Sequence, residues 1–209
     1  MADFGIIRLD WSVDRRGYDL AEIPERAAST LLMGRLAPGL YVKPRGGDLN
    51  DYTAHLREKD IFLDLARMER SSDGVLAFVH KWGLLDAWPR DAAVREIIWA
   101  SETMEHLLNV VKKGGNALAQ IGRERWHFRL DGEFRGSDVI VRVKSLKAFC
   151  WLEFRQAHLA GGDFYRCANP KCADWRRYPA TGRPNKFCSE ACKKAAQRAR
   201  KKNETAIHS

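Results

Sequence analysis

The sequence lacks the features that would place the protein in a membrane or in an oxidising compartment. Its longest apolar runs are only a few residues, whereas a transmembrane helix needs roughly 20. The N-terminus has no basic segment followed by an apolar stretch, so we expect no signal peptide. Of the five cysteines only Cys150 lies outside the C-terminal quarter, and its place on an apolar stripe favours an inert core thiol. We therefore expect a cytoplasmic protein with reduced cysteines, which favours metal binding over disulfides.

Catalytic signatures are missing as well. The chain has no Gly-rich phosphate loop, nucleophile elbow or paired-carboxylate motif. Nucleases built on a treble-clef zinc fold need histidines around a catalytic metal, yet no histidine occurs between Cys167 and Ile207. Glu102 and His106 could share a metal at one-turn spacing, but a solvated helix face explains this pair better. We therefore expect a protein that is not an enzyme.

The feature that the sequence does contain is a set of four cysteines near its C-terminus. Cys167 and Cys172 are separated by four residues, fifteen residues follow, and Cys188 and Cys192 are separated by three. Two close thiol pairs joined by a short loop suit a tetrahedral Zn²⁺ ion, because each pair can chelate from one local turn. Four thiolates leave no position for water or substrate, so the predicted zinc site is structural.

The residues around the cysteines predict how each pair is presented. Asn169-Pro170 favours a tight reversal between the first two cysteines. Ser189 can cap a helix that places Cys188 and Cys192 one turn apart, with Glu190 in its first turn. A turn and a helix start with two ligands each form the treble-clef plan. We expect Trp175, Tyr178 and Phe187 to pack around the metal, because so small a module has little other core.

Positive charge is concentrated in the same segment. Residues 1–165 carry 24 basic and 24 acidic residues, whereas residues 166–209 carry 12 basic and 3 acidic residues, so the whole net charge of +9 lies there. This asymmetry predicts DNA binding, mainly to phosphates. RNA binding, an acidic protein partner and a merely solvated tail are the alternatives. The predicted contact residues are Arg176, Arg177, Arg183, Lys186, Lys193, Lys194, Arg198, Arg200, Lys201 and Lys202.

Hydrophobic periodicity predicts an α+β fold with a mostly helical body and a small β-hairpin. The expected helices cover residues 51–70, 72–82, 89–113 and 145–160, with further helical stretches in 19–36 and a short extended piece at 40–42. The hairpin would pair residues 126–130 with 139–143 through a loop that includes Asp131-Gly132. We divide the chain into a body (1–162), a treble-clef-like zinc finger (163–202) and a disordered tail (203–209).

The cysteine segment resembles a known family. Tyr165-Arg166-Cys167-Ala-Asn-Pro-Lys-Cys172 and Phe187-Cys188-Ser-Glu-Ala-Cys192-Lys-Lys, about a fifth of the chain, are similar to CGNR-type zinc fingers. In bacteria these fingers follow an ABATE-like domain in stress-linked transcription regulators. Gly83-Leu84-Leu85 and Phe149-Cys150-Trp151 resemble that domain. The resemblance implies DNA binding and regulation, although this chain has Cys-Lys-Lys-Ala where the family motif has Cys-Gly-Asn-Arg.

Overall fold

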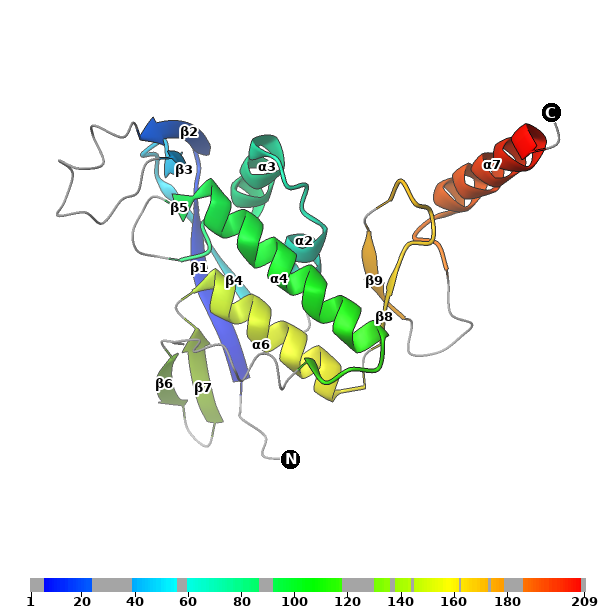
Figure 1. Ribbon diagram of the computed structural model, residues 1–209. Helices are drawn as coiled ribbons and strands as arrows, with labels where there is room; N and C mark the ends of the chain where they lie inside the picture. Colours follow the sequence, from blue (N-terminus) through cyan, green and yellow to red (C-terminus); the bar gives the residue numbers. More distant parts are fainter. Residues whose placement is uncertain are drawn as a thin grey trace.

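The protein has a mixed α/β body from which a long helix projects (Figure 1). The computed structural model describes residues 6–23, 39–55, 60–86, 92–117, 130–135, 138–143, 145–161, 163–172, 174–178 and 186–207. Within these residues the chain forms five helices, three small sheets and a buried core shared by the helices and sheets of the body.

The first sheet has four strands in the order β4 (Leu49–His55), β1 (Ile6–Asp14), β7 (Asp138–Val143) and β6 (Leu130–Arg135). β1 pairs antiparallel with β4 and parallel with β7, so the N-terminal strand lies at the centre of the sheet. The register places Leu9 opposite both Ala54 and Val143. All three side chains are buried, and this row therefore forms the face that packs on the core.

A second sheet extends the body on the other side of the β1–β2 turn. It contains β2 (Tyr18–Ile23), β3 (Gly39–Pro44) and the two-residue β5 (Ala92–Ala93). The buried carboxylate of Asp14 accepts backbone hydrogen bonds from Arg16 and Gly46 at 2.8 Å and from Gly47 at 3.0 Å. Asp14 thereby ties the end of the first sheet to the loop that leaves the second.

Four helices cover the core: α2 (Ile61–Arg67), α3 (Ser72–Trp82), α4 (Val94–Lys112) and α6 (Leu146–Leu159). The helix predicted at 72–82 is α3, which ends at Gly83, where φ is 85°. Its cap is Ser71, whose Oγ accepts a hydrogen bond from the Gly74 amide. α6 likewise begins after Ser145, whose hydroxyl accepts from the Ala148 amide. The helix predicted at 145–160 is confirmed, and the one predicted at 89–113 is confirmed from Val94 onward, whereas Ala92 and Ala93 belong to strand β5 and 89–91 lie outside the described residues.

The prediction of a mostly helical body was wrong in the N-terminal third. Residues 49–55 are the edge strand β4 and not the start of a helix, which begins only at Ile61. Residues 18–23 are strand β2, and 24–38, where further helix was expected, lie outside the described residues. Seven residue pairs between β1 and β4 satisfy the backbone there, and such long-range pairing is not visible in local periodicity.

The predicted hairpin exists, but its first strand begins later than expected. β6 runs from Leu130 to Arg135, and Gly132 lies opposite Val141 inside the ladder. Asp131 and Gly132 are therefore strand residues and not the loop, while 126–129 lie outside the described residues.

The C-terminal part consists of the hairpin β8 (Phe164–Arg166) and β9 (Trp175–Arg177), followed by helix α7 (Glu190–Ile207). Phe164 and Trp175 belong to the main core, being 3% and 0% exposed. The hairpin is thus built into the body, so the core does not end at the predicted boundary of 162. α7 continues through 203–207, which we expected to be disordered. None of the described helices is both long and apolar enough to cross a membrane.

Candidate metal centre and basic helix

The first two cysteines lie at the tip of the β8–β9 hairpin. The Cys167 amide donates to the Asp174 carbonyl at 2.9 Å, which closes the ladder just beyond the strands. Between the cysteines the backbone turns at Asn169, whose carbonyl accepts from the Cys172 amide at 2.9 Å and whose side-chain oxygen accepts from the Lys171 amide at 3.2 Å. This is the tight reversal predicted from Asn169-Pro170, and it brings both thiols to one side of the turn.

The second two cysteines lie at the start of α7. Ser189 Oγ accepts a hydrogen bond from the Cys192 amide at 3.2 Å, and the Ser189 carbonyl accepts from the Lys193 amide at 3.1 Å. Ser189 therefore caps the helix as predicted, and it sets Cys188 and Cys192 one turn apart. The Ala168 amide donates to the Lys186 carbonyl at 2.7 Å and joins the two ligand-bearing segments.

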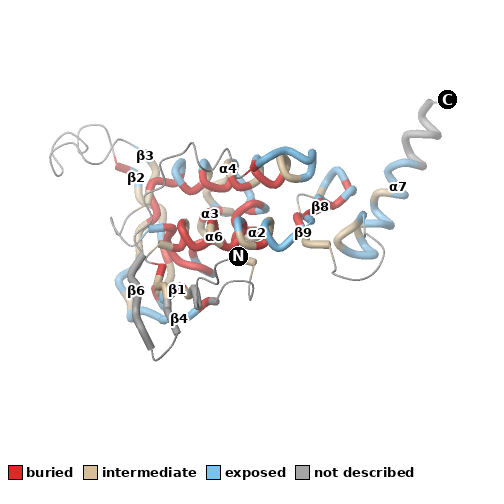
Figure 2. Tube along the Cα trace, turned by 90° about the horizontal axis from the view of Figure 1, so that it is seen from below, coloured by how far each residue is buried: buried red, intermediate tan, exposed pale blue. Residues whose placement is uncertain are grey.

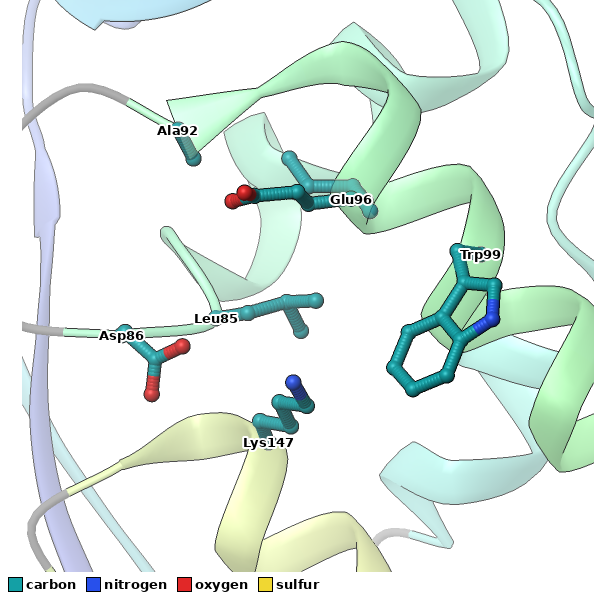
Figure 3. Close-up of a pocket in the computed structure, with 7 residues that line it drawn as sticks. Leu85, Asp86, Ala92, Glu96, Trp99 and Lys147 are labelled. Carbon is teal, nitrogen blue, oxygen red and sulfur yellow. The ribbon is translucent and has the colours of Figure 1, made fainter. Parts of the chain in front are cut away.

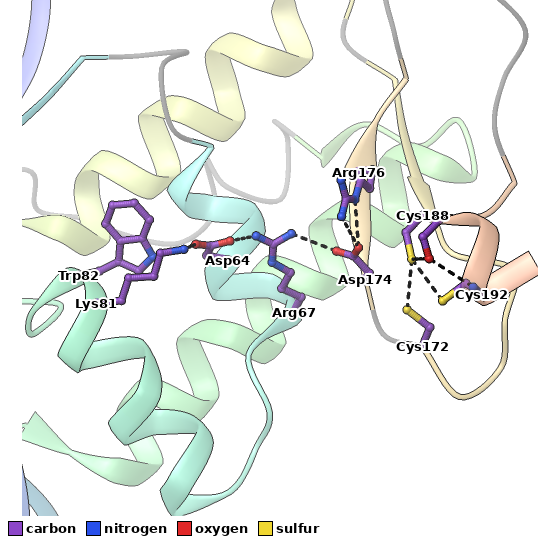
Figure 4. Close-up of polar contacts among 10 residues, drawn as sticks. Asp64, Arg67, Lys81, Trp82, Cys172, Asp174, Arg176, Cys188 and Cys192 are labelled. Atoms are coloured by element: carbon purple, nitrogen blue, oxygen red, sulfur yellow. Dashed lines mark hydrogen bonds and ion pairs between the residues drawn. The ribbon is translucent and has the colours of Figure 1, made fainter. Parts of the chain in front are cut away.

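The four thiols converge on one point, and Figure 4 shows three of them, Cys172, Cys188 and Cys192. Their sulfur atoms all lie within 4.8 Å of one another, with Cys172 and Cys188 Sγ 3.7 Å apart and Cys188 and Cys192 Sγ 3.4 Å apart. A metal–sulfur bond of about 2.3 Å in a regular tetrahedron separates the sulfurs by about 3.8 Å, whereas a disulfide requires about 2.05 Å. The spacing therefore fits a shared metal ion and not a pair of disulfides, and all four cysteines are free.

The pKa values of the thiols also fit a shared metal ion. Burial and then the neighbouring thiols raise the pKa of Cys188, and burial raises the pKa of Cys172. Hydrogen bonds from the Asn169 side chain and then from Cys188 and Ser189 lower the pKa of Cys192 to about 7. Cys172 and Cys188 therefore favour the protonated thiol, because burial disfavours the thiolate. A bound cation would reverse this preference, because metal binding displaces thiol protons.

Ion pairs fasten the cysteine turn to the body. Figure 4 shows a chain of contacts in which Asp64 accepts from Lys81 and pairs with Arg67, and Arg67 in turn donates to Asp174 at 3.0 Å. Asp174 is the residue whose carbonyl accepts from the Cys167 amide. On the other strand, Arg166 pairs with Glu105 of α4 at 3.1 Å. The position of the first cysteine pair is thus set by helices α2 and α4.

The predicted DNA-contacting residues fall into three groups. Exposed basic side chains on α7 and just before it are Lys186, Lys193, Lys194, Arg198 and Arg200. Arg176 pairs with Asp174, and Arg177 pairs with Asp60 and lies over the Phe62 ring, so these two residues stabilise the hairpin. Lys201 and Lys202 are in α7 but their side chains lie outside the described ones, as does Arg183 altogether.

One of the aromatic residues expected around the metal is placed differently, because Trp175 is in the core of the body. Tyr178 lies against Tyr165 with ring centroids 4.8 Å apart, and Phe187 is half-buried next to Cys188. Trp175 therefore joins the hairpin to the body.

Sequence reasoning missed a buried carboxyl at the same junction. Glu153 of α6 is 1% exposed, and its Oε2 accepts from the Phe62 amide at the start of α2 at 3.2 Å. The pKa of Glu153 is raised to about 7, mainly by burial and then by the nearby Asp60, while the hydrogen bond from the Phe62 amide and the charge of Arg177 lower it. A glutamate between Cys150 and Phe154 on the apolar side of a predicted helix was the available signal.

Of the other metal pair weighed from the sequence, Glu102 and His106, Glu102 has a partner in the structure. It lies 4.0 Å from Arg70, which also pairs with Glu105 of α4. Among the residues that the structure describes, the four cysteines are the one group of three or more cysteine, histidine, aspartate or glutamate side chains whose ligand atoms converge.

Comparison with models of known protein families gives no match for this chain, and comparison with curated proteins gives none either. The likeness to CGNR-type fingers therefore stands on the residues quoted for it.

Proposed function

We propose that the four cysteines hold a structural Zn²⁺ ion in a treble-clef-like module. The proposal is supported by converging sulfurs at tetrahedral spacing, with two contributed by a turn and two by the start of a helix. Bound as thiolates, the four sulfurs would fill the coordination sphere of zinc, and the ion would supply cross-linking and not catalysis. Metal analysis of the purified protein should find a single zinc ion per chain, and Cys192→Ser should lower this content.

We propose further that α7 binds DNA through its phosphates. The observation that carries the proposal is the exposure of Lys193, Lys194, Arg198 and Arg200 on a helix that projects from the core (Figure 2). Alanines at 195, 196 and 199 keep the helix narrow, and the segment holds the whole net charge of the chain. A narrow basic helix on a rigid base can lie along a groove of DNA and neutralise several phosphates.

The biological setting that we infer is regulation of transcription in bacteria, with the body responding to a signal and the finger contacting DNA. This inference rests on the resemblance to CGNR-type regulators. Lys193 and Lys194 stand where the family motif has Gly and Asn. We therefore expect contacts to phosphates to dominate over contacts to bases, because lysine pairs with phosphate without reading sequence.

Fluorescence anisotropy with a mixed-sequence DNA duplex, repeated across a salt series, tests the proposal. If about five side chains neutralise phosphates, the logarithm of the association constant falls against log salt with a slope of about −4.5. Lys194→Gln with Arg198→Gln should weaken binding and reduce the steepness of that slope by about 2. The matched control is Lys112→Gln with Lys113→Gln, two exposed lysines at the end of α4.

Binding that is independent of salt, or equal for the α7 variant and the α4 control, would contradict the DNA proposal. The same titration with single-stranded RNA separates the RNA alternative, which predicts tighter binding to RNA than to the duplex. A zinc-loaded protein with no affinity for either nucleic acid would leave an acidic protein as the partner of α7.

A further inference from the structure

A hollow of about 330 Å³ lies in the body, away from the cysteines, where the segment before residue 87 meets the N-terminal ends of α4 and α6 (Figure 3). Its lining side chains come from three separate parts of the chain. They are Leu85, Asp86, Ala92, Glu96, Ile97, Trp99 and Lys147. The volume is at the lower end of the range for small-molecule sites, which is roughly 300–1,000 Å³.

The base of the hollow is fixed by hydrogen bonds. The Lys147 amide donates to the Leu85 carbonyl at 3.0 Å, and Ser145 Oγ donates to the same carbonyl at 3.1 Å. The Ser145 hydroxyl also lies 2.7 Å from Asp86 Oδ1. Leu85 and Ile97 are buried and provide an apolar base. The backbone at Leu85 and Lys147 and the carboxylate of Asp86 are therefore held before any ligand binds, which reduces the ordering cost of binding.

The walls of the hollow present carboxylates, an ammonium group and an aromatic ring at separate places. In Figure 3 the carboxylates of Asp86 and Glu96 lie on one side, and the indole of Trp99 lies on the other. The Lys147 ammonium points into the space between them, 5.4 Å from the centre of the Trp99 ring. Trp99 is 46% exposed, which is high for a tryptophan, a residue that is mostly buried on average.

We infer that this hollow binds a free α-amino acid with an apolar or aromatic side chain. The ligand ammonium would lie at Asp86 and Glu96, its carboxylate at Lys147, and its side chain against Trp99. The Lys147 ammonium would repel an organic cation, and the two carboxylates would repel an organic anion. A zwitterion is complementary to both signs of charge. The inference is independent of the proposed zinc site and of DNA binding, because it uses none of their residues.

Phenylalanine is the probe, because its ring suits the exposed indole. Saturation-transfer NMR on the full-length, metal-loaded protein should detect binding, with a dissociation constant of about 1 mM or tighter. Phenethylamine lacks the carboxylate and 3-phenylpropionate lacks the ammonium. Each should bind at least about tenfold more weakly than phenylalanine, since each lacks one of the two charged groups that the walls complement.

The variants Lys147→Gln and Trp99→Ala test whether phenylalanine binds in this hollow. Each should weaken phenylalanine binding about tenfold or more, whereas Arg155→Gln, an exposed position on α6, should leave it unchanged. Lys147→Gln keeps the backbone hydrogen bond to Leu85, so an unaltered unfolding temperature verifies that this variant is folded. The inference is overturned by phenethylamine or 3-phenylpropionate binding as tightly as phenylalanine, by binding that Lys147→Gln does not weaken, or by no signal at roughly 10 mM phenylalanine. In that last case the contact between Trp99 and Lys147 serves only to join α4 and α6.

Discussion

The two cysteine pairs of the candidate metal centre are supported in opposite ways. Cys167 and Cys172 lie on a hairpin whose Phe164 and Trp175 are part of the main core and whose Asp174 is paired to α2. Cys188 and Cys192 begin α7, in which the described side chains up to Arg200 are exposed apart from the half-buried Cys192 and Ala196. One half of the centre therefore belongs to the body. The other half is joined to it by the hydrogen bond from the Ala168 amide to the Lys186 carbonyl, and a bound metal ion would add the main connection.

This difference gives the two halves of the module separate roles: the hairpin folds as part of the body, and α7 carries the exposed basic side chains. An isolated helix of the length of α7 is marginally stable in water, because its packing partners are few and its nucleus is costly. A metal ion shared with the rigid hairpin would fix the start of the helix and so the direction in which its basic side chains point. The body would then provide the support and the ion would provide the connection.

Metal removal should produce the largest change. A structural zinc ion contributes on the order of 10 kcal/mol to a small module, so chelation or Cys192→Ser should remove hydrogen-exchange protection from α7. The amides of α4 and α6 should keep theirs, because the core residues of β8 and β9 remain in place. Hydrogen exchange followed by mass spectrometry compares the three helices directly.

Cys150 supplies the control for that experiment. This thiol is fully buried in α6, and burial raises its pKa well above the usual range, so it is an inert core group. Cys150→Ala should lower the protection of the whole body and leave metal content unchanged. If chelation removes protection from α4 and α6 as well as from α7, the body and the metal centre unfold as one unit and the comparison fails.

Trp175→Ala should have the next largest effect and should act on the body. Removing this fully buried indole leaves a cavity in the main core, which costs about 3–5 kcal/mol. Ala199→Gly on the exposed face of α7 should cost about 1 kcal/mol of helix stability and should leave the unfolding of the body unchanged. Chemical denaturation followed by tryptophan fluorescence measures both variants. If the two variants lower the unfolding free energy of the body equally, the hairpin contributes no more to the body than α7 does.

The sequence was sufficient wherever a local rule decided the structure. The serine cap of α7, the glycine at the end of α3 and the turn at Asn169 all follow from side-chain hydrogen bonds or backbone freedom within a few residues. The cysteine cluster was predictable for the same reason, since each pair is set by one turn and the spacing restricts the ligands to a common centre.

The errors arose where distant segments meet. β4 is a strand because it pairs with β1, and Trp175 is in the core because its hairpin packs on α2, and neither partner lies nearby in the sequence. The sequence also did not reveal that Arg177, which its charge assigns to DNA, pairs with Asp60, more than a hundred residues earlier. Local periodicity carries no information about such pairings.

Glu153→Gln should have a pH-dependent effect on the junction between hairpin and body. The pKa of Glu153 is raised from 4.5 to about 7, so the fold favours the neutral carboxyl. The stabilisation that the fold gains from the neutral carboxyl is complete below pH 4.5. It is lost as the pH rises through 7, and the loss is about 3 kcal/mol at most. The unfolding free energy of the variant should equal that of the wild type at pH 5 and be larger at pH 8, because glutamine can still accept the Phe62 hydrogen bond. Unfolding free energies at the two pH values check this, and a variant less stable at pH 8 would contradict it.

Asp174→Asn should have the smallest effect and tests the ion pairs that fasten the cysteine turn. The hydrogen bonds from Arg67 and Arg176 outweigh the burial that opposes them and lower the pKa of Asp174. Its stabilising contribution is therefore present at neutral pH and is lost as the pH falls below about 4. Because Arg67 is partly exposed, solvent screening limits the cost of the variant to about 0.2–1 kcal/mol at pH 7. Glu190→Gln removes the exposed pair with Lys193 on α7 and should leave the unfolding free energy of the body unchanged. If Asp174→Asn costs nothing while Trp175→Ala has its full effect, apolar burial alone joins the first cysteine pair to the body. The difference in support between the two pairs would then be one of packing and not of charge.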